Sequence, residues 1–123
     1  MKILIVDDDQ EYIRLYKEIL SDRGLELLGA QDPDEALTAL KENKGIGMVL
    51  LDYNMPGVDN KDLVHSMRNI SSDVKILINS NYPIDYQMKT LSGVDGYNDK
   101  FCSTDDLLTS IKKILNGSTT PSL

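Results

Sequence analysis

The chain alternates short apolar runs with segments of helical periodicity, and this alternation restricts the fold more than any other feature. The apolar runs are KILIV at residues 2–6, LELLGA at 25–30, GMVLLD at 47–52 and VKILIN at 74–79. The run at 47–52 is continuous, which is typical of a strand covered on both faces. A fifth strand, GVDGYNDK at 93–100, is expected to be short and is unusually polar.

Five helical segments separate or follow these strands, and most have a recognisable start or stop signal. They are expected over residues 9–23, from Pro33 to near Gly45, from Asp59 or Asn60 onward, around 84–91, and from Ser103 to Gly117. Strands that alternate with helices in this way form a parallel sheet with right-handed crossovers and helices on both faces. The predicted fold class is therefore α/β and doubly wound, with ligands bound outside the carboxyl ends of the strands.

The length and the net charge of the chain restrict the functions that it can have. The 123 residues are enough for one domain with its own core. Lys plus Arg is 13 against 20 for Asp plus Glu, a formal net charge of −7, which argues against binding a phosphate backbone or an anionic membrane and suits a divalent cation. No apolar run is long enough to span a bilayer or resembles a secretion leader, and the single cysteine fits a reducing compartment. We therefore expect a cytoplasmic protein.

Polar side chains follow four of the five predicted strands. Asp7 and Asp8 follow the first strand, Asp52 ends the third, Ser80 follows the fourth and Lys100 ends the fifth. Closely packed carboxylates raise each other's pKa or bind a cation, and Mg²⁺ prefers such oxygen ligands. An ammonium and a hydroxyl can contact phosphoryl oxygens, and a carboxylate can accept a phosphoryl group as a nucleophile. This combination predicts Mg²⁺-dependent phosphoryl transfer at the sheet edge.

The stretches ILIVDDD, VLLDYNMPGVD, KILINS and GYNDK resemble the receiver domain of bacterial response regulators, the CheY-like superfamily, and the resemblance covers residues 2–116. It implies a flavodoxin-like (βα)5 fold with strand order 2-1-3-4-5. It also implies a phosphorylation-dependent switch in two-component signalling, whose phosphoryl donor is a sensor histidine kinase or a phosphotransfer protein. The receiver domain is expected over residues 1–117, followed by a polar tail or linker at 118–123.

The same resemblance assigns the acidic residues. Asp52 is expected to be the phosphoacceptor and to contact Mg²⁺. Asp8 is expected to be a direct ligand of the metal, while Asp7 acts through water. The backbone carbonyl of Asn54 is expected to supply a further ligand.

The resemblance also assigns the residues that respond to phosphorylation. Ser80 takes the place of the family's Thr or Ser, and Lys100 that of its lysine. Tyr97 matches the aromatic switch residue that turns inward on activation. Ser80 and Tyr97 would relay the signal to a face built from the helix at 84–91, the fifth strand and the last helix, which is where a dimer partner or an effector domain is expected to bind.

Several residues depart from the family pattern. Phe101 replaces the usual proline after the lysine, and because a cis bond before a non-proline residue costs about 3 kcal/mol, its peptide bond is expected to be trans. Asn81 replaces a small residue and is expected to crowd or hydrogen-bond within the phosphoryl pocket. Asn79, Asn98 and Asp99 stand where apolar residues are usual. Because a buried polar group without a partner costs about 1–3 kcal/mol, these three are expected to face solvent or an interface.

Other polar and aromatic residues are interpreted as structural. His65 is expected at or near the surface and Cys102 as an inert thiol. Asp9 is expected to begin the first helix, where its charge suits the helix dipole. Tyr12 and Tyr16 belong to the apolar stripe of that helix.

Three other functions are weighed against the receiver reading. A phosphorylation-independent interaction module of the same fold remains an alternative because of Asn81 and Phe101. A phosphatase or phosphotransferase with an aspartyl nucleophile usually has a second acid where this chain has Asn54, so no turnover of an external substrate is expected. A nucleotide or flavin site is not supported, because no glycine-rich loop follows the first predicted strand.

Overall fold

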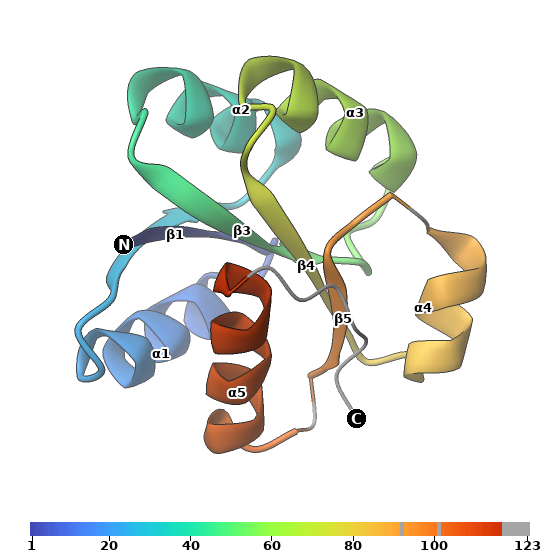
Figure 1. Ribbon diagram of the computed structural model, residues 1–123. Helices are drawn as coiled ribbons and strands as arrows, with labels where there is room; N and C mark the ends of the chain where they lie inside the picture. Colours follow the sequence, from blue (N-terminus) through green and yellow to red (C-terminus); the bar gives the residue numbers. More distant parts are fainter. Residues whose placement is uncertain (92, 101, 117–123) are drawn as a thin grey trace.

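The structure, a computed structural model, describes residues 1–91, 93–100 and 102–116. Over this part of the chain, five strands alternate with five helices (Figure 1). The elements are β1 (Lys2–Val6), α1 (Gln10–Ser21), β2 (Glu26–Ala30), α2 (Pro33–Glu42), β3 (Ile46–Asp52), α3 (Asn60–Ile70), β4 (Lys75–Ser80), α4 (Ile84–Thr90), β5 (Gly96–Asp99) and α5 (Thr104–Leu115). All strand pairs are parallel and the order is β2-β1-β3-β4-β5, which confirms the predicted fold.

The helices cover both faces of the sheet. Figure 1 shows α1 and α5 on one face, α2 and α3 on the other, and α4 beside β5. Because successive side chains of a strand point to opposite faces, the central strands supply two cores. Leu4 and Val49 pack with α2 and α3, whereas Ile3 and Leu50 pack with α1 and α5. The sheet therefore lies between two apolar layers.

Side-chain caps begin the helices at the predicted positions. The Asp9 carboxylate accepts hydrogen bonds from the backbone N–H groups of Glu11 and Tyr12, which fixes the start of α1 directly after the acidic cluster. Asp59 and Ser103 cap α3 and α5 in the same way. These caps confirm that Asp9 has a structural role and set the direction in which each helix leaves the sheet edge.

The start of α2 agrees with the predicted start at Pro33 and has a capping box, whereas its end differs from the prediction. Asp32 accepts from the N–H of Glu35, and the Glu35 carboxylate accepts from the N–H of Gln31. The helix ends at Glu42 rather than near Gly45. The Asn43 side chain donates to the Ala39 carbonyl at 2.9 Å, satisfying a carbonyl in the last turn.

The expectation that Asn79 and Asn98 face solvent or an interface is wrong. Only 2% of Asn79 and 0% of Asn98 is exposed. The two residues are directly paired between β4 and β5, and the Asn98 amide donates to Asn79 Oδ1 at 2.9 Å. The Asn79 amide in turn donates to the Tyr12 hydroxyl at 2.7 Å. Burial is tolerated because these amides hydrogen-bond with one another and with the tyrosine. Asp99 is half-buried.

Some sequence-based expectations fall on residues 101 and 117–123, which lie outside the described residues. They are the conformation of the Lys100–Phe101 peptide bond, the stop signal at Gly117, and the tail or linker at 118–123. The described part of α5 ends at Leu115, with Asn116 as its C-cap. None of the helices in the described ranges has the length and apolar character that crossing a membrane requires.

Candidate functional site

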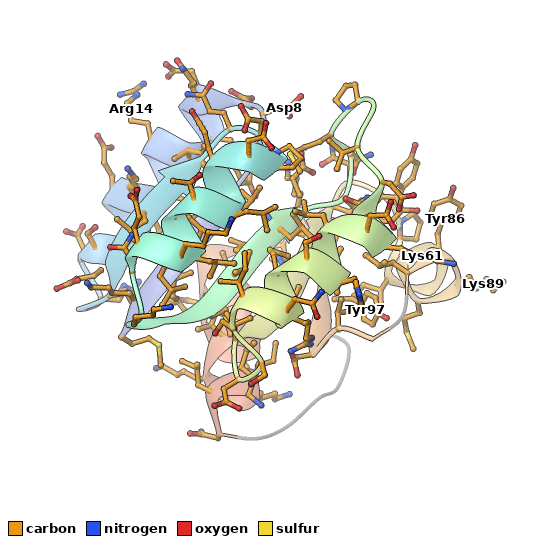
Figure 2. The ribbon with its side chains drawn as sticks, turned by 90° about the horizontal axis from the view of Figure 1, so that it is seen from above. Asp8, Arg14, Lys61, Tyr86, Lys89 and Tyr97 are labelled. Atoms are coloured by element: carbon orange, nitrogen blue, oxygen red, sulfur yellow. The ribbon has the colours of Figure 1, made fainter. Side chains whose placement is uncertain are left out.

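Three carboxylates gather where β1 and β3 end. Asp7 and Asp8 directly follow β1, and Asp52 is the last residue of β3. Each of the three offers one carboxylate oxygen, and these oxygens lie within 4.8 Å of one another. Asp7 and Asp52 are only 2% and 3% exposed, whereas Asp8 is exposed (Figure 2). Oxygen ligands at this spacing, with one side open to solvent, fit a hard divalent cation that retains water.

Lys100 completes this cluster from the end of β5. Its Nζ lies 2.8 Å from Asp7 Oδ2 and 3.2 Å from Asp52 Oδ1, and 12% of its side chain is exposed. Burial by itself would lower the pKa of the Lys100 ammonium. The hydrogen bond to Asp7 and the charges of Asp52 and Asp7 outweigh burial, so its pKa lies above the ordinary value. Lys100 is therefore held in its charged form between two carboxylates.

The pKa of the Asp52 carboxyl is shifted in the direction that burial predicts. Burial raises its pKa above the ordinary value, and the nearby Asp7 charge acts in the same direction. A hydrogen bond from the Asn54 backbone N–H, 3.0 Å from Asp52 Oδ1, and the Lys100 charge reduce this rise without cancelling it. The carboxylate form of Asp52 is thus poorly stabilised by the protein alone, which favours a cation as an additional partner.

Ser80 is fully buried at the end of β4 and is connected to the cluster through Asn54. Its hydroxyl donates to Asn54 Oδ1 at 2.7 Å, and its Oγ accepts from the Tyr82 N–H at 3.0 Å. Because the Asn54 backbone also donates to Asp52, one residue contacts both Ser80 and Asp52. Sequence reasoning assigned only the carbonyl of Asn54 and missed the role of its side chain.

Tyr97 lies apart from the acidic cluster. It is half-buried on β5, and Figure 2 shows it well separated from Asp8. Its hydroxyl donates to the Leu91 carbonyl at 2.6 Å, and its ring packs against the core under α2 and α3. Burial raises the pKa of the Tyr97 phenol. The structure therefore brings Asp7, Asp52 and Lys100 into contact but does not place Tyr97 among them.

One aromatic residue, Tyr12, does contact the site, although the sequence pattern did not predict this contact. Tyr12, interpreted as part of a helix stripe, has its ring under the Lys100 ammonium, with Nζ 4.2 Å from the ring centroid. Burial is the main cause of a raised Tyr12 phenol pKa. Its position three residues after the helix cap was the available signal, because the first turn of α1 begins beside the strand ends.

Three further expectations concern surface residues and the thiol. His65 is exposed, as predicted. Asn81 is also exposed, so its side chain is not enclosed in the site. Cys102 is half-buried, and its thiol donates to Asn98 Oδ1 at 3.4 Å. Burial raises the pKa of the Cys102 thiol, which agrees with an inert thiol rather than a reactive one.

Comparison with known proteins decides the family. The family model of the response regulator receiver domain matches residues 3–112. The chain belongs to the response regulator receiver domain family. Receiver domains are signalling switches of two-component systems, they bind Mg²⁺ at an acidic pocket, and they interact with histidine kinases or phosphotransfer proteins.

Curated relatives of this receiver domain are bacterial regulators. The transcriptional regulatory protein CpxR of Klebsiella pneumoniae subsp. pneumoniae is 31% identical over 118 residues, which are 95% of this chain and 50% of that protein. The chemotaxis protein CheY-3 of Vibrio cholerae is 41% identical over 70 residues, or 55% of this chain and 52% of that protein. This receiver domain spans about half the length of the transcriptional regulatory proteins that it matches.

Solved structures share the fold. The response regulator TrrA of Thermotoga maritima, crystallised in complex with Mg²⁺-BeF, has a TM-score of 0.80 and 30% identity, covering 92% of this chain and 97% of that chain. A receiver domain protein from Clostridium thermocellum also has a TM-score of 0.80, with 27% identity and 94% coverage of both chains.

Proposed function

We propose that this receiver domain is switched by phosphorylation of Asp52 from a histidine kinase or phosphotransfer protein. The observation that carries the proposal is the contact of one ammonium, Lys100, with both Asp7 and Asp52, beside an open carboxylate at Asp8. A nucleophile, a cation site and a fixed positive charge are the parts that phosphoryl transfer requires.

Asp52 acts as the nucleophile in this proposal. Its Oδ1 accepts from the Asn54 N–H and faces Lys100, so we assign attack to Oδ2. The new bond joins Oδ2 to the phosphorus of a phosphohistidine, the N–P bond of the donor breaks, and the imidazole leaves with a proton taken up from solvent. The product is an aspartyl phosphate, which water later hydrolyses back to the carboxylate.

The residues fit Mg²⁺, with Asp8 and Asp52 as direct carboxylate ligands, Asp7 acting through water and Asn54 supplying its backbone carbonyl. When bound, the cation lowers the repulsion between these carboxylates and the phosphoryl oxygens. Lys100 is already within 3.2 Å of Asp52 and supplies a second positive charge to the same oxygens. Ser80 supplies a hydroxyl donor from β4.

The switch follows from the hydrogen bonds that Ser80 and Tyr97 make. Ser80 donates to Asn54 Oδ1, and we infer that its hydroxyl turns to a phosphoryl oxygen once Asp52 is modified. Tyr97 donates to the Leu91 carbonyl just after α4, and we infer that it exchanges this bond for an inward position. The surface of α4, β5 and α5 would then change, and this face would bind a dimer partner or an effector domain.

The biological setting follows from the proposed chemistry and the relatives. CpxR and PrrA are named as transcriptional regulatory proteins, and this chain covers about half of each, so we propose an output through a separate effector. The acidic domain itself, with net charge −7, binds neither nucleic acid nor membrane in this proposal, and it works in the cytoplasm.

We assign residues 1–117 to the receiver domain, with 118–123 as a tail or linker. It modifies only itself and turns over no external substrate.

The direct test is mass spectrometry of the intact protein after incubation with Mg²⁺ and acetyl phosphate. The wild type gains one phosphoryl group, and Asp52→Asn gains none. Asp9→Asn is the matched control, because it removes the same charge nearby while asparagine still caps α1, and it gains the group normally. A wild type that gains nothing contradicts the proposed function while leaving the family membership intact.

A further inference from the structure

Tyr12 and Lys100 form a contact that the proposed phosphorylation chemistry does not itself explain. The ammonium lies over the Tyr12 ring, with Nζ 4.2 Å from the centroid, within the range of a cation–π interaction. The lysine side chain is only 12% exposed, and such contacts strengthen when they are shielded from water. We propose that Tyr12 is a positioning residue, which holds the Lys100 ammonium at the place where the phosphoryl group arrives.

The Tyr12 ring is itself held from two sides. Its hydroxyl accepts a hydrogen bond from the Asn79 amide at 2.7 Å, and Asn79 accepts from Asn98 at 2.9 Å. The ring of Tyr16, one turn further along α1, lies 4.3 Å away between centroids at an angle of 47°. Asn79 and Asn98 are buried on β4 and β5, so the sheet interior fixes where the ring can lie.

This arrangement gives Lys100 a partner whose charge does not change during the reaction. A lysine has a long flexible stem and binds as a point charge, so its position depends on what surrounds the ammonium. Asp52, one neighbour of the ammonium at 3.2 Å, becomes an acyl phosphate in the proposed reaction, whereas Asp7 at 2.8 Å remains a carboxylate. The Tyr12 ring keeps its electrostatic character throughout, and it therefore restricts the ammonium both before and after transfer.

The competing explanation is that Tyr12 only fills the core and satisfies Asn79. Two substitutions separate the explanations. Tyr12→Phe keeps the ring under Lys100 but removes the hydroxyl partner of Asn79. Tyr12→Leu keeps apolar volume but removes the ring. If Tyr12 had a purely structural role, both variants would be less stable. They would then not differ from one another in the phosphorylation rate or in the NMR shifts of Lys100.

The kinetic test measures the rate of Asp52 phosphorylation by acetyl phosphate at saturating Mg²⁺, and this arm rests on the proposed function. Loss of a shielded cation–π contact corresponds to about a tenfold slower rate in Tyr12→Leu. Tyr12→Phe is expected to retain a rate within about threefold of wild type, because the ring remains. Equal rates for Tyr12→Leu and wild type, or an equal loss in both variants, would overturn the positioning role.

A second measurement needs no phosphorylation. A proton above an aromatic ring is shielded, so in the NMR spectrum of the unphosphorylated protein the Lys100 side-chain protons nearest Nζ are expected upfield of those of other lysines. The upfield shift is retained in Tyr12→Phe and lost in Tyr12→Leu, while backbone amide spectra check that both variants are folded. Wild-type Lys100 signals at ordinary lysine positions would overturn the proposal even if Tyr12→Leu fails to fold. If the Lys100 shift is observed but the wild type gains no phosphoryl group by mass spectrometry, the phosphorylation proposal fails, whereas the contact between Tyr12 and Lys100 is still supported.

Discussion

The ammonium of Lys100 lies 2.8 Å from the carboxylate of Asp7, which joins the end of β5 to the end of β1 across the sheet edge. In the sheet, β3 and β4 lie between β1 and β5, so this ion pair passes over the ends of both strands. Asp52 ends β3, and its Oδ1 lies 3.2 Å from the same Lys100 nitrogen. One positive charge therefore offsets part of the repulsion among three acidic residues.

Replacing Lys100 by Met is expected to destabilise the protein in the absence of divalent cations. The change leaves Asp7 and Asp52 buried without their cationic partner, and breaking such a buried pair costs about 3 kcal/mol. Urea denaturation with EDTA measures the loss. Adding Mg²⁺ is expected to recover more stability in Lys100→Met than in wild type, because the cation replaces the missing positive charge. An unchanged midpoint in EDTA would contradict the neutralising role of Lys100.

Asp8 and Asp9 differ in their expected contribution to Mg²⁺ binding. Asp8 belongs to the carboxylate cluster, whereas Asp9 caps α1 with its side chain. Asp8→Asn is expected to weaken Mg²⁺ binding at least about tenfold, because even residues that only orient a ligand contribute that much. Asp9→Asn is expected to weaken it only slightly, although both changes remove one negative charge. Titration with Mg²⁺ followed by NMR gives the two affinities. Equal weakening would mean that net charge, and not ligation, determines affinity.

The paired amides of Asn79 and Asn98 are expected to be coupled energetically. Asn79→Leu removes the acceptor that the Asn98 amide contacts at 2.9 Å and the donor that the Tyr12 hydroxyl contacts at 2.7 Å, and losing one partner of a buried hydrogen bond costs about 1–3 kcal/mol. The double variant Asn79→Leu/Asn98→Leu is expected to be less destabilised than the sum of the two single changes, since both amides are removed together. Free energies of unfolding in urea test this. Simple additivity would show that the amides are independent.

Ser80→Ala is expected to separate phosphorylation from switching. The change removes the hydroxyl that donates to Asn54 but leaves Asp52 and Lys100 in place. With Mg²⁺ and beryllofluoride, which stands in for the phosphoryl group, wild-type Tyr97 ring signals are expected to shift in the NMR spectrum. In Ser80→Ala the same addition is expected to shift them less, although the ligand still binds. A full Tyr97 response in Ser80→Ala would exclude Ser80 from the relay.

The thiol of Cys102 gives a pH-dependent prediction. Burial raises its pKa, and because only the thiolate is nucleophilic, alkylation by iodoacetamide is expected to rise at higher pH in the folded protein than in urea. The folded state favours the neutral thiol, so its contribution to stability is complete below the pKa of the unfolded thiol and is lost as pH rises through the higher folded value. Cys102 is the one cysteine of the chain, which makes the reaction unambiguous. Identical profiles would contradict the shift.

The sequence predicted the fold and the convergence of the charged site because both depend on local patterns. Apolar runs separated by helical segments specify parallel strands, and parallel strands bring Asp7, Asp52 and Lys100 to one edge whatever the details of packing. Asp9 was placed correctly for the same reason, since a helix cap is a local interaction.

The interior hydrogen bonds were not predictable in this way. Asn79 and Asn98 were expected at a surface because sequence gives the cost of a buried amide but not its partners, which come from α1 and from the neighbouring strand. Tyr12 fits a helix stripe equally well whether its ring faces apolar residues or an ammonium. The assigned roles of Ser80 and Tyr97 depend on motion, and they stay predictions.

The double contact of Asn54 has a thermodynamic consequence for regulation. Its backbone N–H holds Asp52, while its side chain accepts the Ser80 hydroxyl. In the proposed switch, modification of Asp52 and release of Ser80 would therefore act on one another through a shared residue, and such linkage is reciprocal. A partner that binds preferentially when Ser80 has left Asn54 would favour the acyl phosphate to the same degree that the acyl phosphate favours the partner. Output proteins would then govern how long the signal lasts.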